Sequence, residues 1–588
     1  MAPSTTNNTS NGTTNGAGNE TVNDTTNGAP TSGGCPFIGL GAAQPDFPHE
    51  SNHEGSFLTT MNGAPVAKPA ASQRIGNQLR ATLLLQDINL LELIQHVTHE
   101  RIPERLVHAR GFNANGYFEV TDDITDITSA AFLNQVGKKT PLLTRFSTVA
   151  GERGSAETVR DTRGFAFKLR TEEGILDWLF LSTPVFPIRD GAKFPSFTHA
   201  TKRNPKSGLP DHTMFWDYFN NNQEAIHFLM FLFSDRATPI DFQHADCFSI
   251  NTYRFTKQDG TFVYVKIHVK TDQGVQNYTA AQAQCVAGAD PDHQTRSLFT
   301  ELEAGGTPSW SVYAQIIDPE KAASYPINIF DATKTLPLAD FPLKKFGRIV
   351  LDKNVENFFA ESEQSAFSPT NLVPGWALSP DPILQTRALA YADTQRHRLG
   401  TNFIQLPVNR PAHSFNPVNR DGMSSLGNNL GATPNYFPSS FFNYGVAPQY
   451  AQPDEEHWLG TVEDFQSQVV AADYDQARIF WQQTLAAEPG QQDNLVSNVA
   501  GHLSSALKKV RQATYAMFSL VDKSLGDRIQ AATEAIVTGN TAPAASEASS
   551  MTKEMQDLKI ADLHRKKQTG VEGHNFDLFA HKKWNLQP

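Results

Sequence analysis

Two stretches of the sequence place side chains that could do chemistry at useful spacings. In RALAYADTQRHRLG, Arg387 precedes Tyr391 by four residues, so a helix puts both on one face. A guanidinium beside a phenol favours the phenolate by charge and hydrogen bonding. In LLTRFSTV, a strand of period two places Arg145, Ser147 and Val149 on one side. Because an isolated Tyr–Arg pair is more often an ordinary surface pair, the surrounding elements must decide.

The composition permits a large folded body. The chain has 588 residues, of which 39% are hydrophobic and 19% charged, so a sizeable core is expected. The formal net charge of -12 argues against a nucleic-acid partner. No apolar run approaches the roughly 18 residues of a membrane helix, so no membrane partner is expected.

The elements that must position these residues are mostly strands. Short strand-like runs fill residues 106–270, and one hairpin turns at Asp259-Gly260, after which Val263, Val265 and Ile267 alternate with polar residues. Closely spaced strands indicate an antiparallel barrel or sandwich. A helix is expected around Leu90 to Val97.

The C-terminal part turns helical. Apolar residues recur at i+3/i+4 spacing and predict one amphipathic helical face, formed by Val496, Val499, Leu503, Leu507 and Val510. A second helical run extends from Leu525 to Val537 and ends at Gly539.

Long ordered segments resemble the haem catalase family. They include ERIPERLVHARGFNANGYFEV, TPLLTRFSTVAGERGSAETVRDTRGFAFK and FSPTNLVPGWALSPDPILQTRALAYADTQRHRLG. The resemblance implies an α+β catalase fold with an eight-stranded antiparallel barrel, a b-type haem and a homotetramer. With composition, it divides the chain into a disordered Asn/Thr/Gly-rich arm (1–64), a threading arm (65–107), the haem-binding barrel (108–353), a wrapping segment with the proximal tyrosine (354–455), a helical domain (456–540), and a linker and tail (541–588).

The resemblance also implies site residues. Tyr391 stands where the family binds iron through a tyrosine, His108 where it has the distal acid/base, and Ser147 where it hydrogen-bonds that histidine. A His flanked by Val107 and Ala109 is by itself more often a core or surface residue. The implied haem contacts are Arg105, Val107, Arg145, Val149, Leu181, Phe194, Arg387 and Arg398.

The run LFLSTP departs from the family. Leu181 stands where the family has a catalytic asparagine, and no Asn lies between Gly174 and Asp190. Loss of one preorganised donor typically costs about 10²–10³ in rate, and the pocket becomes better suited to an apolar group.

This departure favours oxidation of a small organic substrate by O₂, superoxide or peroxide. The closest resemblance is to catalase-like fungal oxidases of the chanoclavine-I synthase type in alkaloid biosynthesis, which cyclise and decarboxylate a prenylated tryptophan derivative. Two alternatives stay open: a hydrogen-peroxide-decomposing catalase with weakened activity, and a haem-binding relative without turnover. The intact His108 and Tyr391 argue against the latter.

NADPH binding also stays open. The residues that match the family's nucleotide site are His227, Ser234, Arg236 and Lys270. Asp246, Leu336 and Leu338 depart from that pattern, and Asp246 would repel a phosphate. The sequence shows no secretory signal and ends in NLQP rather than an SKL-type address, so a cytoplasmic or peroxisomal location is expected.

Overall fold

The computed structural model describes residues 56–76, 81–441, 445 and 462–539. Of the arm predicted to be disordered (1–64), residues 1–55 lie outside this part of the chain, as do the predicted linker and tail (541–588); residues 56–64 are described, and Thr59 forms a bridge with Pro65. In the described residues, no helix is both long and apolar enough to cross a membrane.

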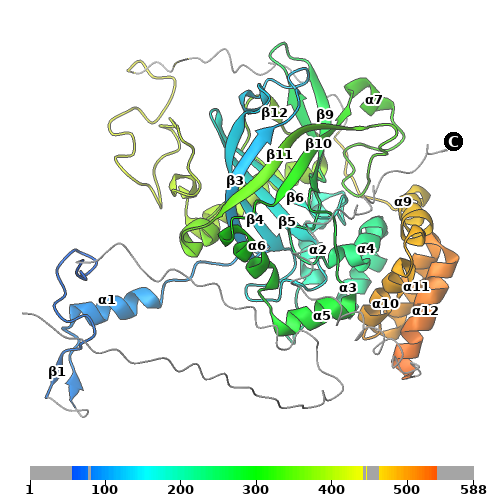
Figure 1. Cartoon of the computed structure of the whole chain (residues 1–588), viewed down its shortest axis with the longest axis horizontal. Coiled ribbons are helices and arrows are strands. Elements are labelled where there is room, and N and C mark those ends of the chain that lie inside the picture. The colour runs from blue at the N-terminus through cyan, green and yellow to red at the C-terminus, as the bar shows by residue number, and fades with distance from the viewer. Residues whose placement is uncertain (1–55, 77–80, 442–444, 446–461, 540–588) are drawn as a thin grey trace, which may run out of the picture.

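Eight antiparallel strands close into a barrel at the centre of the molecule (Figure 1). Their order is β10-β11-β3-β4-β5-β6-β7-β9, and β9 pairs back with β10 to close the wall. The strands are β3 (Gly111–Val120), β4 (Lys139–Thr148), β5 (Arg163–Thr171), β6 (Gly174–Leu181), β7 (Cys247–Phe248), β9 (Phe262–Thr271), β10 (Ser309–Ile317) and β11 (Leu343–Asn354). The predicted eight-stranded antiparallel barrel is thereby confirmed.

The barrel interior is aromatic. Phe146, Phe165 and Phe180 on three adjacent strands belong to one buried cluster, together with Trp178 and Trp310. Since side chains alternate across a strand, the residues between these aromatics point outward. The outer face of β4, β5 and β6 is therefore available to form a site.

The predicted hairpin is confirmed. Strand β8 (Tyr253–Thr256) pairs with β9 around a turn in which Lys257 N donates to Thr261 O at 2.9 Å. Gly260 takes a φ of +84° there, which favours glycine. Strand β12 (Trp376–Ala377) adds beyond β8.

Helices cover one side of the barrel and extend away from it. Those that follow the barrel strands are α2 (Phe194–Thr201), α3 (His212–Asn220), α4 (Ile226–Phe233), α5 (Ala280–Ala289), α6 (His293–Glu303), α7 (Pro319–Ser324) and α8 (Pro382–Leu399). The C-terminal ones are α9 (Asp475–Ile479), α10 (Gln491–Leu503), α11 (Lys508–Val521) and α12 (Lys523–Thr538). A second core joins this group to α3 and α4 through residues such as Trp216, Phe233 and Phe518.

The single helical face predicted over residues 496–510 is wrong. Helix α10 ends at Leu503 and α11 begins only at Lys508. Leu507 lies in the break, is 58% exposed, and its N–H donates to Thr213 Oγ1 at 3.1 Å. The predicted end of the last helix is confirmed, because Gly539 caps α12 with a φ of +69°.

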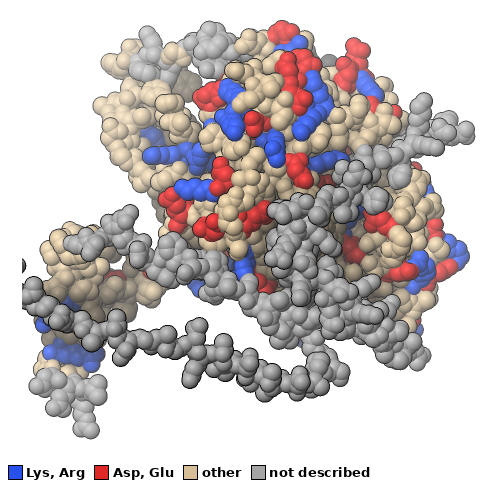
Figure 2. Space-filling view, in the orientation of Figure 1, with Lys and Arg blue, Asp and Glu red and all other residues tan. Residues whose placement is uncertain are grey.

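The N-terminal arm lies away from the barrel in Figure 1. It holds the short strands β1 (Arg74–Ile75) and β2 (Thr82–Leu83) and helix α1 (Ile88–Val97), as the sequence predicts for the helix. Ile88, Leu93, Ile94 and Val97 on α1 are each more than half exposed. On the body itself, Figure 2 shows acidic and basic side chains interspersed over the face that carries β3, β10 and β11.

Candidate active site

The predicted haem-site residues converge on one cavity outside the barrel wall. Its lining includes Arg105, Val107, His108, Arg145, Ser147, Val149, Leu181, Phe194, Arg387 and Tyr391. Arg398 lies behind this lining and donates to Oε1 of Gln395, a lining residue, at 3.0 Å. Segments nearly 300 residues apart thus meet in one place.

A row across three strands forms the wall beside His108. Ser147 pairs with Gly164, and Gly164 pairs with Leu181, so the three positions share one face. A Cβ on Gly164 would lie 2.5 Å from His108 Nδ1 and 2.6 Å from Ser147 Oγ. The imidazole therefore lies over the glycine, with Ser147 and Leu181 on either side.

His108 is held in an unusual conformation. Its φ is +61°, a region that non-glycine residues rarely adopt. Its N–H donates to Val149 O at 2.9 Å, and its Nδ1 lies 2.9 Å from Ser147 Oγ. Burial, followed by the charges of Arg145, Arg387 and Arg105, lowers the pKa of His108 to about 3. The imidazole is therefore neutral at physiological pH and can accept a proton.

Tyr391 and Arg387 lie on α8 as the spacing predicts. Arg387 Nη2 donates to Tyr391 Oη at 3.3 Å and to Leu179 O at 2.9 Å. Burial lowers the pKa of Arg387, but the phenol oxygens of Tyr391 and Tyr253 outweigh burial and leave it raised. A permanent cation beside the tyrosine oxygen stabilises a phenolate ligand.

Asn251 lines this side of the cavity and is bonded to Asp381, and no sequence pattern pointed to either residue. Arg387 Nη1 donates to Asn251 Oδ1, and Asn251 Nδ2 donates to Asp381 Oδ2 at 2.9 Å. Ile250, also in the lining, has a φ of +62° and its carbonyl accepts from Lys266 Nζ at 2.6 Å. Because the amide of Asn251 is committed to these partners, it does not replace the one missing at Leu181.

Three guanidiniums gather at one end of the cavity, those of the partly buried Arg105 and of the buried Arg145 and Arg398. Burial and neighbouring arginines lower the pKa of Arg105 well below its ordinary value and that of Arg145 to about 9, while Glu363 opposes the shift. Arg145 Nε is buried and has no hydrogen-bond partner in the described part of the chain. Such a cluster favours an anionic group.

These features fit a haem. The cavity is lined mainly by apolar side chains, has a tyrosine with an adjacent cation as a candidate iron ligand, and ends in guanidiniums that could pair with carboxylates. In a bound haem, Tyr391 would be the iron ligand, and Arg105 and Arg145 would pair with the acidic substituents.

The residues predicted for NADPH already make contacts within the protein. Ser234 is fully buried and its Oγ donates to Phe231 O at 2.8 Å, while the buried ring of His227 packs near Phe231 and Phe480. Arg236 and Lys270 both interact with Asp246 electrostatically. The carboxylate that the sequence marked as repulsive thus already faces both cations.

Comparison with known proteins identifies the family. The catalase family model matches residues 59–443, and the catalase-related immune-responsive model matches residues 470–533. Catalase A of Botryotinia fuckeliana is 75% identical over 449 residues, which cover 76% of this chain and 94% of that protein. Peroxisomal catalase of Pichia angusta is 46% identical over 491 residues, covering 80% and 96%. The structure of catalase A from Saccharomyces cerevisiae superposes with a TM-score of 0.79 at 44% identity, covering 81% of this chain and 99% of that one.

These relatives overturn the predicted alkaloid oxidase. A protein that is 75% identical carries the name catalase A, and no comparison supports a chanoclavine-I synthase or a small organic substrate. The error came from giving one substituted position, Leu181, more weight than the rest of the chain. The chain belongs to the catalase family, whose members are haem oxidoreductases.

Proposed function

We propose that the protein decomposes hydrogen peroxide to water and dioxygen with a bound b-type haem. The observation that carries this proposal is the pairing, in one apolar cavity, of a neutral His108 with a Tyr391 that Arg387 contacts. The names of the relatives support the same reaction.

The reaction consumes two molecules of peroxide. One gains two electrons and two protons and becomes two waters, and the other loses two electrons and two protons and becomes dioxygen. The haem iron supplies the two-electron redox chemistry when bound. His108 takes the proton from one peroxide oxygen and returns it to the leaving oxygen, while Ser147 holds the orientation of the imidazole.

Leu181 is expected to weaken this activity. Its side chain lies beside His108 where a hydrogen-bond donor could contact peroxide, and hydrocarbon offers no such bond. The cost of one missing donor is about 10²–10³ in rate. Proton transfer through His108 does not depend on that donor, so turnover persists at a reduced level.

The proposal is tested with the purified haem-loaded full chain. Peroxide loss should be catalytic in the wild type and fall about 10²–10⁴-fold in His108→Ala. His199→Ala, an exposed histidine on α2, is the matched control and should retain the wild-type rate. Equal rates in His108→Ala and the control would refute His108 as the proton carrier, and no catalytic loss in the wild type would refute the reaction.

We also infer a homotetramer within an intracellular compartment. The exposed apolar residues of α1, among them Leu93, Ile94 and Val97, give the arm a surface suited to another copy of the chain. The relative from Pichia angusta is named peroxisomal. Size measurement of the native protein and fractionation of cells test these two points.

A further inference from the structure

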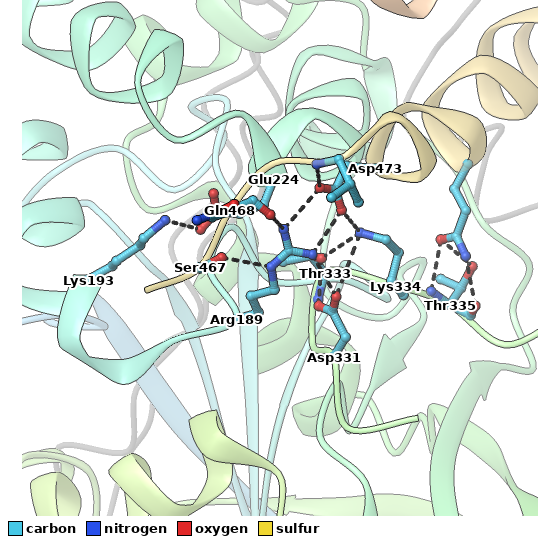
Figure 3. A network of polar contacts seen from close by, with 12 residues as sticks. Arg189, Lys193, Glu224, Asp331, Thr333, Lys334, Thr335, Ser467, Gln468 and Asp473 are labelled. Carbon is cyan, nitrogen blue, oxygen red and sulfur yellow. Dashed lines mark hydrogen bonds and ion pairs between the residues drawn. The ribbon is translucent and has the colours of Figure 1, made fainter. Parts of the chain in front are cut away.

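An ion cluster lies directly behind the cavity wall (Figure 3). The loop that follows β6 lines the cavity with Phe186, Pro187 and Ile188, and the next residue is Arg189. The guanidinium of Arg189 lies against Asp331 and Asp473, with Lys334 beside them. The wall and this cluster are therefore connected through one backbone bond.

Arg189 uses all of its hydrogen-bonding capacity. Its Nη1 donates to Asp331 Oδ2 at 3.0 Å and to Asp473 Oδ1 at 2.9 Å, and its Nη2 donates to Asp473 Oδ2 at 2.9 Å. The remaining bonds go to Gln468 O at 2.9 Å and, from Nε, to Ser467 Oγ at 2.8 Å. A guanidinium has five N–H donors, so each one has a partner here.

The cluster is balanced in charge and largely buried. Lys334 Nζ donates to Asp473 Oδ1 at 2.6 Å and lies 3.8 Å from Asp331 Oδ2. Two cations thus face two carboxylates, and the side chain of Asp473 is only 1% exposed. Burial would raise the pKa of Asp473, but Arg189 and Lys334 outweigh it and lower the pKa to about 2. The carboxylate of Asp473 therefore stays ionised over the physiological pH range.

Three distant segments meet in this cluster. Residues 467–473 lead directly into the C-terminal helices, where Gln476 is bonded twice to the backbone of Thr335. The segment 331–335 is also bonded to the cavity wall, because Phe186 N donates to Ala332 O at 2.8 Å. Ala332 and Ile188 belong to the apolar cluster that includes Leu181.

We infer that Arg189 is a positioning residue for the cavity. Through its bonds to Asp473, the docking of the C-terminal helices contributes to this positioning. The inference rests on the proposed function for its meaning, because the cavity is where peroxide would bind. A loosened cluster releases Pro187 and Ile188 and widens the approach to the haem. The C-terminal region thereby controls access to a site to which it contributes no lining residue among those described.

The test compares Arg189→Lys, Asp473→Asn and their double variant in the haem-loaded full chain. Lysine keeps the charge but cannot form the two-bonded contact with Asp473. Asp475→Asn is the matched control, because this partly exposed carboxylate lies two residues away and pairs with the nearby Arg478 at 2.8 Å.

Two readouts are independent of turnover. Cyanide association, followed by the haem absorption band, should be faster by about twofold or more in each single variant. A twofold change corresponds to the low end of the interaction energies between residues of one ion-pair network. Amide hydrogen exchange should accelerate across residues 182–190. For both readouts, the double variant should show less than the sum of the two single effects. In steady-state kinetics, which form a separate readout, KM for peroxide should change more than kcat.

Unchanged cyanide association and exchange in folded single variants would overturn the inference, as would strictly additive effects. If Arg189→Lys does not fold, Ser467→Ala removes a single neutral bond and should shift both readouts in the same direction by less; no shift there also overturns it. Failure of the wild type to decompose peroxide would refute the proposed function, while cyanide binding and exchange would still decide the role of Arg189.

Discussion

Restoring an amide at position 181 should increase peroxide decomposition. Adjacent strands lie about 4.8 Å apart, so the backbones of Ser147 and Leu181 are separated by about 10 Å, with Gly164 between them. The imidazole of His108 occupies that gap. In Leu181→Asn, a side chain of similar size would place an N–H donor next to the imidazole.

The expected gain is about 10²–10³ in kcat/KM, the usual value of one preorganised donor. The variant should also be less stable by about 1–3 kcal/mol, because Leu181 packs with Ile188, Ile250 and Ile383 in an apolar cluster. Initial rates of peroxide loss and thermal unfolding measure the two effects.

Leu179→Asn is the matched control. Leu179 lies on the same strand, lines the same cavity and is similarly buried. It is two residues, about 6.7 Å, further from the His108 row. The amide at 179 should not raise the rate. An unchanged rate in Leu181→Asn, or an equal gain in both variants, would refute the assignment of this position as the missing donor.

Three further predictions concern the same region. Gly164→Ala should displace His108, because the added Cβ would lie 2.5 Å from its Nδ1, and peroxide decomposition should fall about 10²–10⁴-fold while circular dichroism stays unchanged. Lys168→Met should destabilise the fold by about 3–5 kcal/mol, because it leaves the buried Asp177 carboxylate without its 2.9 Å partner. Adding Asp177→Asn should recover part of the loss in a denaturant titration, because it removes the charge and keeps an oxygen acceptor for Ser368 and Asn371. Since the pKa of His108 is lowered to about 3, its neutral form persists above that pH, so kcat/KM should be flat from about pH 5 to pH 9 and fall only as the pH approaches 3; a decline centred near pH 6.5 would contradict this.

The sequence predicted an element well where the spacing of its apolar residues stayed constant along the whole element. The alternation that includes Val265 and Ile267 gave β9, and Asp259-Gly260 gave its turn, because both depend on neighbours in the chain. The prediction around Leu507 was wrong because i+3/i+4 spacing also continues across a helix break when the next helix resumes in phase. Apolar spacing alone does not reveal that break.

Long-range partners in the site could not be predicted from the sequence. Asn251 is separated from Arg387 by 136 residues, and Arg189 from Asp473 by 284. Neither pair belongs to a local motif, so only the closed barrel and the docked C-terminal helices bring them together. The predicted alkaloid oxidation was wrong for a related reason. It depended on a single position, Leu181, whereas the similarity to catalase A extends over 449 residues.

The yield of dioxygen tests the central claim most directly. An oxygen electrode and peroxide absorbance, recorded together on the haem-loaded protein without any organic donor, give the ratio of product to substrate. The account predicts one dioxygen released for every two peroxides consumed. Peroxide loss that releases no dioxygen, or that requires an added organic reductant, would contradict it.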